Sequence, residues 1–233
     1  MRIIFTFILL FAMTCSLSAQ NNFKQKQLTF ERVKTAYTQK WAGLKQELQQ
    51  KGFKDKFEIH IEAYKSEGKL EIWLRNSTQA KYSLFKTYDF SAHSGILGPK
   101  TKKDDLQTPE GIYFIDRFNP ESRFYLSLRI NYPNAVDLLR SGQQDPGSDI
   151  YIHGNKLTVG CIPLTDDKIK EVYVMAVEAS NNGQVKIPVH IFPFKMTKQN
   201  MNKKTAVFPQ HKIFWKTLQL AYDNFKNYKN SII

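Results

Sequence analysis

Hydrophobic positions first recur at helical spacing, between residues 29 and 51. They form one apolar stripe that comprises Val33, Tyr37, Trp41, Leu44 and Leu48. Thr29 is a suitable N-cap and Gly52 is a natural stop. The pattern predicts a long amphipathic helix that packs on the rest of the chain.

From residue 57 onward apolar and polar residues alternate, as is typical of half-buried strands. Short candidate strands lie around residues 57–61, 70–74, 82–90, 111–115 and 124–128. Turn-rich segments separate them, with little helix between. This arrangement predicts a mainly β protein with flanking helices, built on an antiparallel sandwich or barrel.

Helical spacing returns at Thr165, a good N-cap, and we expect that helix to end at residues 181–183. Residues 185–191 then alternate like a strand. Pro188 within it predicts either an edge strand or a backbone nitrogen on an unpaired side. A last amphipathic helix is expected from about residue 209 to 228.

The N-terminal residues have the pattern of an export signal. Arg2 gives a positive start, residues 3–13 are apolar except for one threonine, and small residues precede a cleavage point after Ala19. The run is too short to span a bilayer. We therefore expect residues 1–19 to be a signal peptide and the protein to be exported to the periplasm or cell envelope. Lipidation at Cys15 is the less favoured alternative, because the preceding triplet fits such processing poorly.

The charge balance narrows the choice of partners. The formal charge is +13, and loss of Arg2 with the signal lowers it to +12. The lysines are spread along the chain without any RNA- or DNA-binding signature, so no nucleic-acid partner is expected. The basic surface suits an anionic polymer or membrane of the envelope, or is merely solvated.

Cys161 has no disulfide partner once Cys15 is removed or blocked. One interpretation is a small buried hydrophobic residue. However, an exported protein meets an oxidising compartment that disfavours an idle thiol, and His153 stands eight positions earlier. A thiol with a nearby imidazole favours a nucleophile and its base.

The segment between these two residues completes the candidate site. The Gly-Asn pair at 154–155 predicts a short hairpin that brings the imidazole to the thiol. The carbonyl of Gly154 can then reach the far ring nitrogen of His153 and fix its tautomer. Gly160 permits close approach of a substrate, and backbone N–H groups around Cys161 can form an oxyanion hole.

The other four histidines carry less weight. His60 and His190 lie on the polar side of alternating strands, which predicts solvent exposure, and His211 is expected at the surface. His93, in a glycine-rich turn, is the only rival base. One thiol and scattered histidines do not have the spacing of a closed zinc site, so no metal or cofactor is expected.

His-Gly followed by Val-Gly-Cys resembles the active-site signature of the YkuD L,D-transpeptidase family, in its YafK-like branch. Further similar segments are residues 88–100, 108–111, 131–135 with Asp137, and 165–166. The resemblance implies a YkuD-like catalytic domain at 57–195. A helical segment at 20–56 would precede this domain, and a C-terminal helix within 196–233 would pack on it.

The resemblance implies a monomeric enzyme that acts on peptidoglycan stem peptides. Cys161 would attack a carbonyl between an L- and a D-centre and form a thioester, with His153 as base and Gly160 in the oxyanion region. Glu110, Tyr132 and Gly154 are then expected to shape or contact the substrate cleft.

Two departures from the commonest family pattern leave the acceptor open. Val159 stands where that pattern has a second histidine, and Ile162-Pro163 fills the region of its arginine. Transfer to an amine would cross-link the wall, whereas hydrolysis, slightly favoured here, would trim stems or release a wall-attached lipoprotein. The alternative function is a catalytically silent, basic peptidoglycan-binding module. A thiol redox protein is disfavoured because the chain has no Cys-x-x-Cys.

Overall fold

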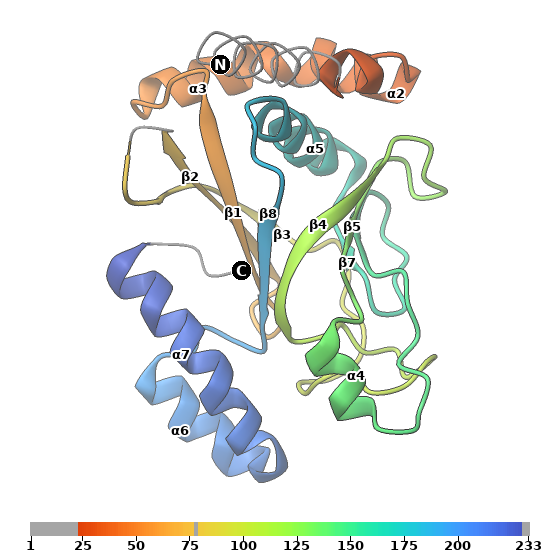
Figure 1. Cartoon of the computed structure of the whole chain (residues 1–233), viewed down its shortest axis with the longest axis vertical. Coiled ribbons are helices and arrows are strands. Elements are labelled where there is room, and N and C mark those ends of the chain that lie inside the picture. Colours follow the sequence, from red (N-terminus) through yellow and green to blue (C-terminus); the bar gives the residue numbers. More distant parts are fainter. Residues whose placement is uncertain (1–22, 77–78, 230–233) are drawn as a thin grey trace, which may run out of the picture.

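The protein is built around one curled sheet of eight strands, in the order β3-β2-β1-β8-β4-β5-β6-β7 (Figure 1). The computed structural model describes residues 23–76 and 79–229, so the predicted signal peptide and Cys15 lie outside the described residues. The strands are β1 (Phe57–Tyr64), β2 (Lys69–Asn76), β3 (Ser83–Asp89), β4 (Gly111–Asn119), β5 (Ser127–Ile130), β6 (Tyr151–His153), β7 (Ile162–Pro163) and β8 (Ile187–Phe192).

The sheet is mixed, because β1 pairs with β8 and β6 with β7 in parallel while the other neighbours are antiparallel. The predicted β-rich fold with flanking helices is confirmed. β8 lies in the middle of the sheet, so an edge position for Pro188 is wrong. Pairing of β8 with β1 begins only at Val189, which leaves Pro188 where no β1 residue needs its N–H.

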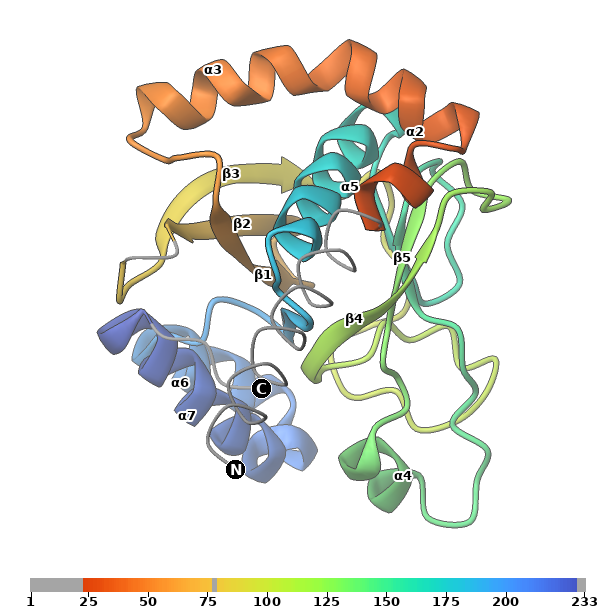
Figure 2. The ribbon, with the colours of Figure 1, turned by 45° about the horizontal axis from the view of Figure 1, so that its top comes forward.

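The predicted N-terminal helix is present as one continuous rod with a π-helical turn in its middle (Figure 2). Its three parts are α2 (Glu31–Ala36), the π-helical turn η1 (Tyr37–Trp41) and α3 (Ala42–Gln50). The expected cap is wrong: Phe30 is the N-cap, while the Thr29 hydroxyl donates to the carbonyl of Lys26.

Helix α5 (Asp166–Asn181) lies between this rod and the sheet. Thr165 caps it as predicted, accepting a hydrogen bond from the Lys168 N–H at 3.3 Å. Most of its side chains are buried, and they join odd-numbered residues of β1, among them Ile59 and Ile61, in the main core. This burial is the principal hydrophobic contribution to the fold.

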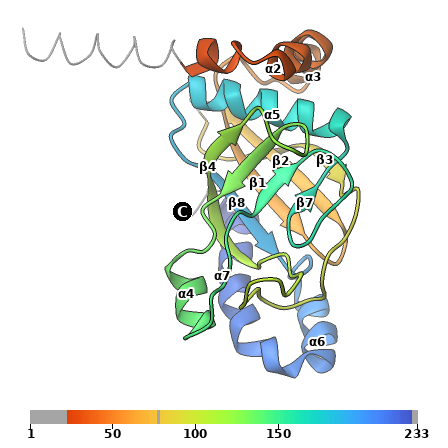
Figure 3. The same cartoon turned by 90° about the vertical axis from the view of Figure 1, so that its right-hand side faces the viewer.

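A pair of helices covers the opposite face of the sheet (Figure 3). They are α6 (Lys198–Val207) and α7 (Lys212–Tyr228), joined by a 3₁₀ turn η2 (Pro209–His211). The expected last helix is confirmed as α7, whereas α6 and the short α4 (Ala135–Ser141) were not predicted. Within the described residues no helix is both long and apolar enough to cross a membrane.

Burial of His60 and His190 corrects the prediction of solvent exposure, since neither side chain reaches solvent. The polar side of β1 and β8 faces α7. Phe225 of α7 stacks on the His60 ring at a centroid distance of 4.0 Å, and the Lys226 ammonium lies 2.6 Å from Oε2 of Glu62. The alternation of polar and apolar residues in these strands therefore marks the two faces of the sheet, and both faces are covered by helices.

Candidate active site

The candidate nucleophile lies where β6 and β7 run side by side. These strands are parallel, with Ile152 opposite Ile162, so the predicted hairpin between His153 and Cys161 is wrong. The segment between His153 and Cys161 instead returns to the start of β6 and places Cys161 beside it. There Sγ accepts a hydrogen bond from the Tyr151 N–H at 3.4 Å and lies 3.7 Å from the Asp149 carbonyl.

Thr158 holds the backbone around the thiol, and the sequence analysis missed it. Its hydroxyl donates to the carbonyl of Cys161 at 2.9 Å and lies 3.3 Å from the Gly160 N–H, which donates to it. Gly160 has φ +134°, and a Cβ there would lie 2.8 Å from the carbonyl oxygen of Gln107. Only glycine fits both the conformation and this close approach.

His153 is buried, and its ring is oriented from two sides. Nδ1 contacts the carbonyl of Gly154, as expected from the sequence, and Phe124 stacks on the ring at a centroid distance of 4.7 Å. Because a carbonyl only accepts, Nδ1 carries the proton and Nε2 of the neutral ring keeps its lone pair. Gly154 is required by packing, since a Cβ would lie 2.6 Å from Oδ1 of Asp166.

Burial shifts the pKa of both candidate groups in the direction that favours their neutral forms. It lowers the pKa of His153, opposed by the Gly154 carbonyl, and raises the pKa of Cys161, opposed by the Tyr151 N–H. Among the described contacts, Nε2 of His153 has no hydrogen bond. Both shifts favour a thiol and a neutral imidazole on adjacent strands over a thiolate–imidazolium pair.

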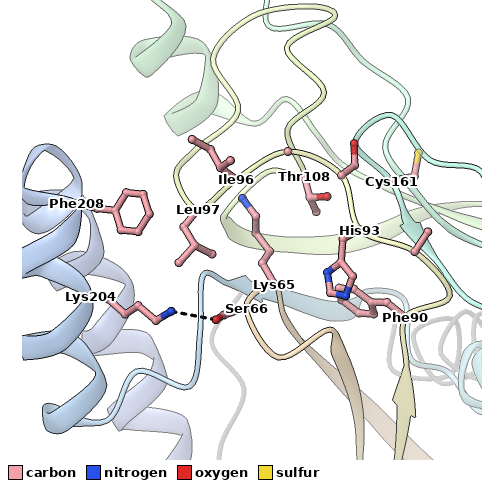
Figure 4. Close-up of a pocket in the computed structure, with 13 residues that line it drawn as sticks. Lys65, Ser66, Phe90, His93, Ile96, Leu97, Thr108, Cys161, Lys204 and Phe208 are labelled. Atoms are coloured by element: carbon pink, nitrogen blue, oxygen red, sulfur yellow. Dashed lines mark hydrogen bonds between the residues drawn. The ribbon is translucent and has the colours of Figure 1, made fainter.

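A cleft of about 360 Å³ opens from Cys161, hereafter the Cys161 cleft (Figure 4). It runs past His93 to Lys204 and Phe208 at the far end, with Lys65 and other residues along its length. His93, the rival base, is therefore in the same cleft as the thiol. Its volume lies at the lower end of the range of about 300–1,000 Å³ that is usual for ligand sites.

Glu110 and Tyr132 lie inside the protein and not along the cleft, and their role in shaping the cleft or binding substrate stays a prediction. Glu110 is only 1% exposed and accepts hydrogen bonds from Lys65 Nζ (3.0 Å), the Gly98 N–H (2.7 Å) and Trp215 Nε1 (2.8 Å). Tyr132 is buried and donates to the Pro146 carbonyl at 2.9 Å. Neither lines the Cys161 cleft.

Among the residues that the structure describes, one group of side chains has donor atoms close enough for a metal ion. Atoms of His60, Glu62 and His190 lie within 4.8 Å of one another, an arrangement that sequence spacing did not predict. However, the Lys226 ammonium already neutralises Glu62 at 2.6 Å, and a divalent cation would add charge beside it in a buried setting. The arrangement fits the docking of α7 better than a metal centre.

Residues 58–191, more than half of the chain, match the L,D-transpeptidase catalytic domain called YkuD. The chain therefore belongs to the YkuD L,D-transpeptidase family, which confirms the resemblance seen in its motifs. It is 34% identical over 170 residues to the L,D-transpeptidase-family protein YafK of Escherichia coli, in strains K12 and O157:H7. The alignment covers 72% of this chain and spans 66% of the length of each relative.

Similar solved structures include those of two further proteins. One is the helical cell shape determining protein Pgp2 of Campylobacter jejuni, with a TM-score of 0.47 and 21% identity over 63% of this chain and 52% of Pgp2. The other is Bd1075 of Bdellovibrio bacteriovorus, with a TM-score of 0.41 and 25% identity over 65% of this chain and 54% of Bd1075.

Proposed function

We propose that this protein is an exported cysteine enzyme that acts on peptidoglycan stem peptides through a thioester on Cys161. Family membership supports the wall as the site of action. The observation that carries the chemistry is the contact between the Gly154 carbonyl and Nδ1 of His153, which leaves Nε2 as a proton acceptor on the strand beside Cys161. The predicted signal peptide supports a periplasmic or envelope location.

The proposed reaction starts from the neutral thiol of Cys161 and the neutral imidazole of His153. Sγ of Cys161 attacks the carbonyl carbon of the substrate amide while Nε2 of His153 takes the thiol proton. The resulting imidazolium returns that proton to the departing amine as the carbon–nitrogen bond breaks, which leaves a thioester. Attack by water or by a second amine, deprotonated in turn by His153, releases the acyl group and restores the thiol.

The molecule that accepts the acyl group from the thioester decides the biological outcome. We expect this acceptor to be water, so that the thioester is hydrolysed. The products would be trimmed stems or a lipoprotein released from the wall. The cleft near the thiol is lined by Thr108 and the exposed His93, which leaves water access to the thioester. Transfer to an amine uses the same thioester and would give cross-linked dimers.

Incubation of purified sacculi with the wild type, Cys161→Ala and His153→Gln, followed by mass analysis of muropeptides, tests this function. Trimmed stems or a released lipoprotein peptide, formed by the wild type and abolished by Cys161→Ala, are expected. New dimers alone would replace hydrolysis by transfer. Sacculi that bind all three proteins and stay chemically unchanged would contradict the enzyme and favour the silent binding module.

A further inference from the structure

The far end of the Cys161 cleft is built by residues outside the segment that matches the family. That match ends at residue 191, whereas Lys204 lies on α6 and Phe208 follows it. Both line the cleft together with the thiol (Figure 4). Helix α6 is therefore part of the candidate active site, and it can add recognition that the catalytic domain alone lacks.

The charged side chains that line the cleft are basic. Among the described residues that line it, none is acidic, and the ionisable ones besides Cys161 are Lys65, His93 and Lys204. The Lys65 charge is balanced by Glu110 at 3.0 Å. Lys204 Nζ donates to the Ser66 hydroxyl at 3.3 Å but forms no ion pair with any acidic side chain in the part of the chain that the structure describes. Its charge is thus available to an anion in the cleft.

The backbone that carries Lys204 is fixed by packing, and its ammonium is held by the hydrogen bond to Ser66. Met201, one turn earlier on α6, is buried in the core, and the Phe208 N–H donates to the Lys204 carbonyl. The helix pair is tied to the cleft by Trp215, whose indole donates to Glu110. A Cβ on Gly98 would lie 2.5 Å from Nε2 of His211. The loop that contains Gly98 and the turn η2 that contains His211 are therefore in close contact. A preorganised charge loses less entropy on binding.

We propose that Lys204 binds a free carboxylate of the peptide at the end of the cleft opposite Cys161, and so selects acidic stem peptides over amidated ones. The proposal rests on the proposed function for the identity of the peptide. Phe208 lines the same end of the cleft and supplies an apolar wall there, which strengthens an ion pair by excluding water. Lys204 is a specificity-determining residue and takes no part in the bond exchange.

Binding of synthetic stem tetrapeptides to Cys161→Ala protein tests the proposal without turnover. Each carboxylate of the peptide is amidated in turn, and dissociation constants are measured by calorimetry. Lys204→Gln should weaken binding of the all-acid peptide about five- to tenfold, the size of a partly screened ion pair with charge-assisted hydrogen bonds. Amidation of one particular carboxylate should cost the same factor, and that cost should vanish in Lys204→Gln.

Two variants separate charge from structure. Lys203→Gln removes an equal charge from the adjacent, exposed position of α6 and should leave the dissociation constants within twofold. Ser66→Ala removes only the hydrogen bond to Lys204 and should keep the preference for acid over amide. An equal loss in both lysine variants, or an amidation cost that persists in Lys204→Gln, would overturn the proposal. Carboxylate-selective binding by a protein that leaves sacculi unchanged would overturn the proposed function alone.

Discussion

Replacing Glu110 with glutamine should destabilise the protein by about 3–5 kcal/mol, the usual cost of breaking a buried ion pair. The carboxylate is 1% exposed and serves three donors, on Lys65, Gly98 and Trp215. Burial lowers the pKa of Lys65 and the charge of Glu110 opposes that shift, so the ammonium depends on its partner. The loss is a large part of a typical total stability of about 5–15 kcal/mol.

A double-mutant cycle isolates this pair. Urea unfolding followed by circular dichroism at pH 7 gives the free energies for the wild type, Glu110→Gln, Lys65→Met and the double variant. The double variant should be more stable than Glu110→Gln alone by about 1–3 kcal/mol, since no uncompensated charge stays buried. A single-variant loss under about 1 kcal/mol, or strictly additive losses, would refute the role assigned to Glu110.

Three further outcomes follow from the site and its surroundings. Because burial lowers the pKa of His60, the unfolded chain binds its proton first on acidification, and stability should fall as the pH drops below about 6.5. In denaturant titrations at several pH values, the free energy of unfolding of His60→Gln should depend less steeply on pH than that of the wild type; an equal dependence would contradict the role of His60. Because the pKa of His153 is also lowered, kcat/KM should fall less between pH 7.5 and pH 6.0 than the roughly three quarters that an ordinary imidazole would lose; a loss that large would contradict this role. Gly160→Ala should slow acylation by a carbapenem more than about tenfold, because its Cβ meets the Gln107 carbonyl. Gly142→Ala is the control: this glycine also has a positive φ but lies in open space, so the variant should react normally; equal rates for the two variants would count against the tight loop.

Local patterns predicted much of the fold because they depend on neighbours in the chain. The Thr165 cap, the helix after it and the alternation of β1 follow from spacing alone. The contact between Gly154 and His153 also needs only adjacent residues. The nucleophile and base were proposed from a lone thiol, an imidazole and the compartment, and those roles stay predictions until tested.

Features that depend on segments distant in the chain cannot be predicted from local sequence patterns. Alternation cannot tell whether a second layer covers a polar face, so the burial of His60 and His190 under α7 was missed. Helix α6 is not predicted from the sequence, because Met201 is its only buried residue and its apolar periodicity is weak. The Gly-Asn pair favours a hairpin by its local chemistry, whereas in the structure the chain, with Asn155 at positive φ, forms a crossover between parallel strands.

The most direct test of the account is the site of acylation. The protein is mixed with purified disaccharide-tetrapeptide, quenched in acid and analysed by intact mass and peptide mapping, beside Cys161→Ala and His153→Gln. The account predicts a thioester adduct on the peptide that contains Cys161, reduced in His153→Gln and absent in Cys161→Ala, with turnover lost in parallel. An adduct on another residue, or undiminished turnover by Cys161→Ala, would contradict it.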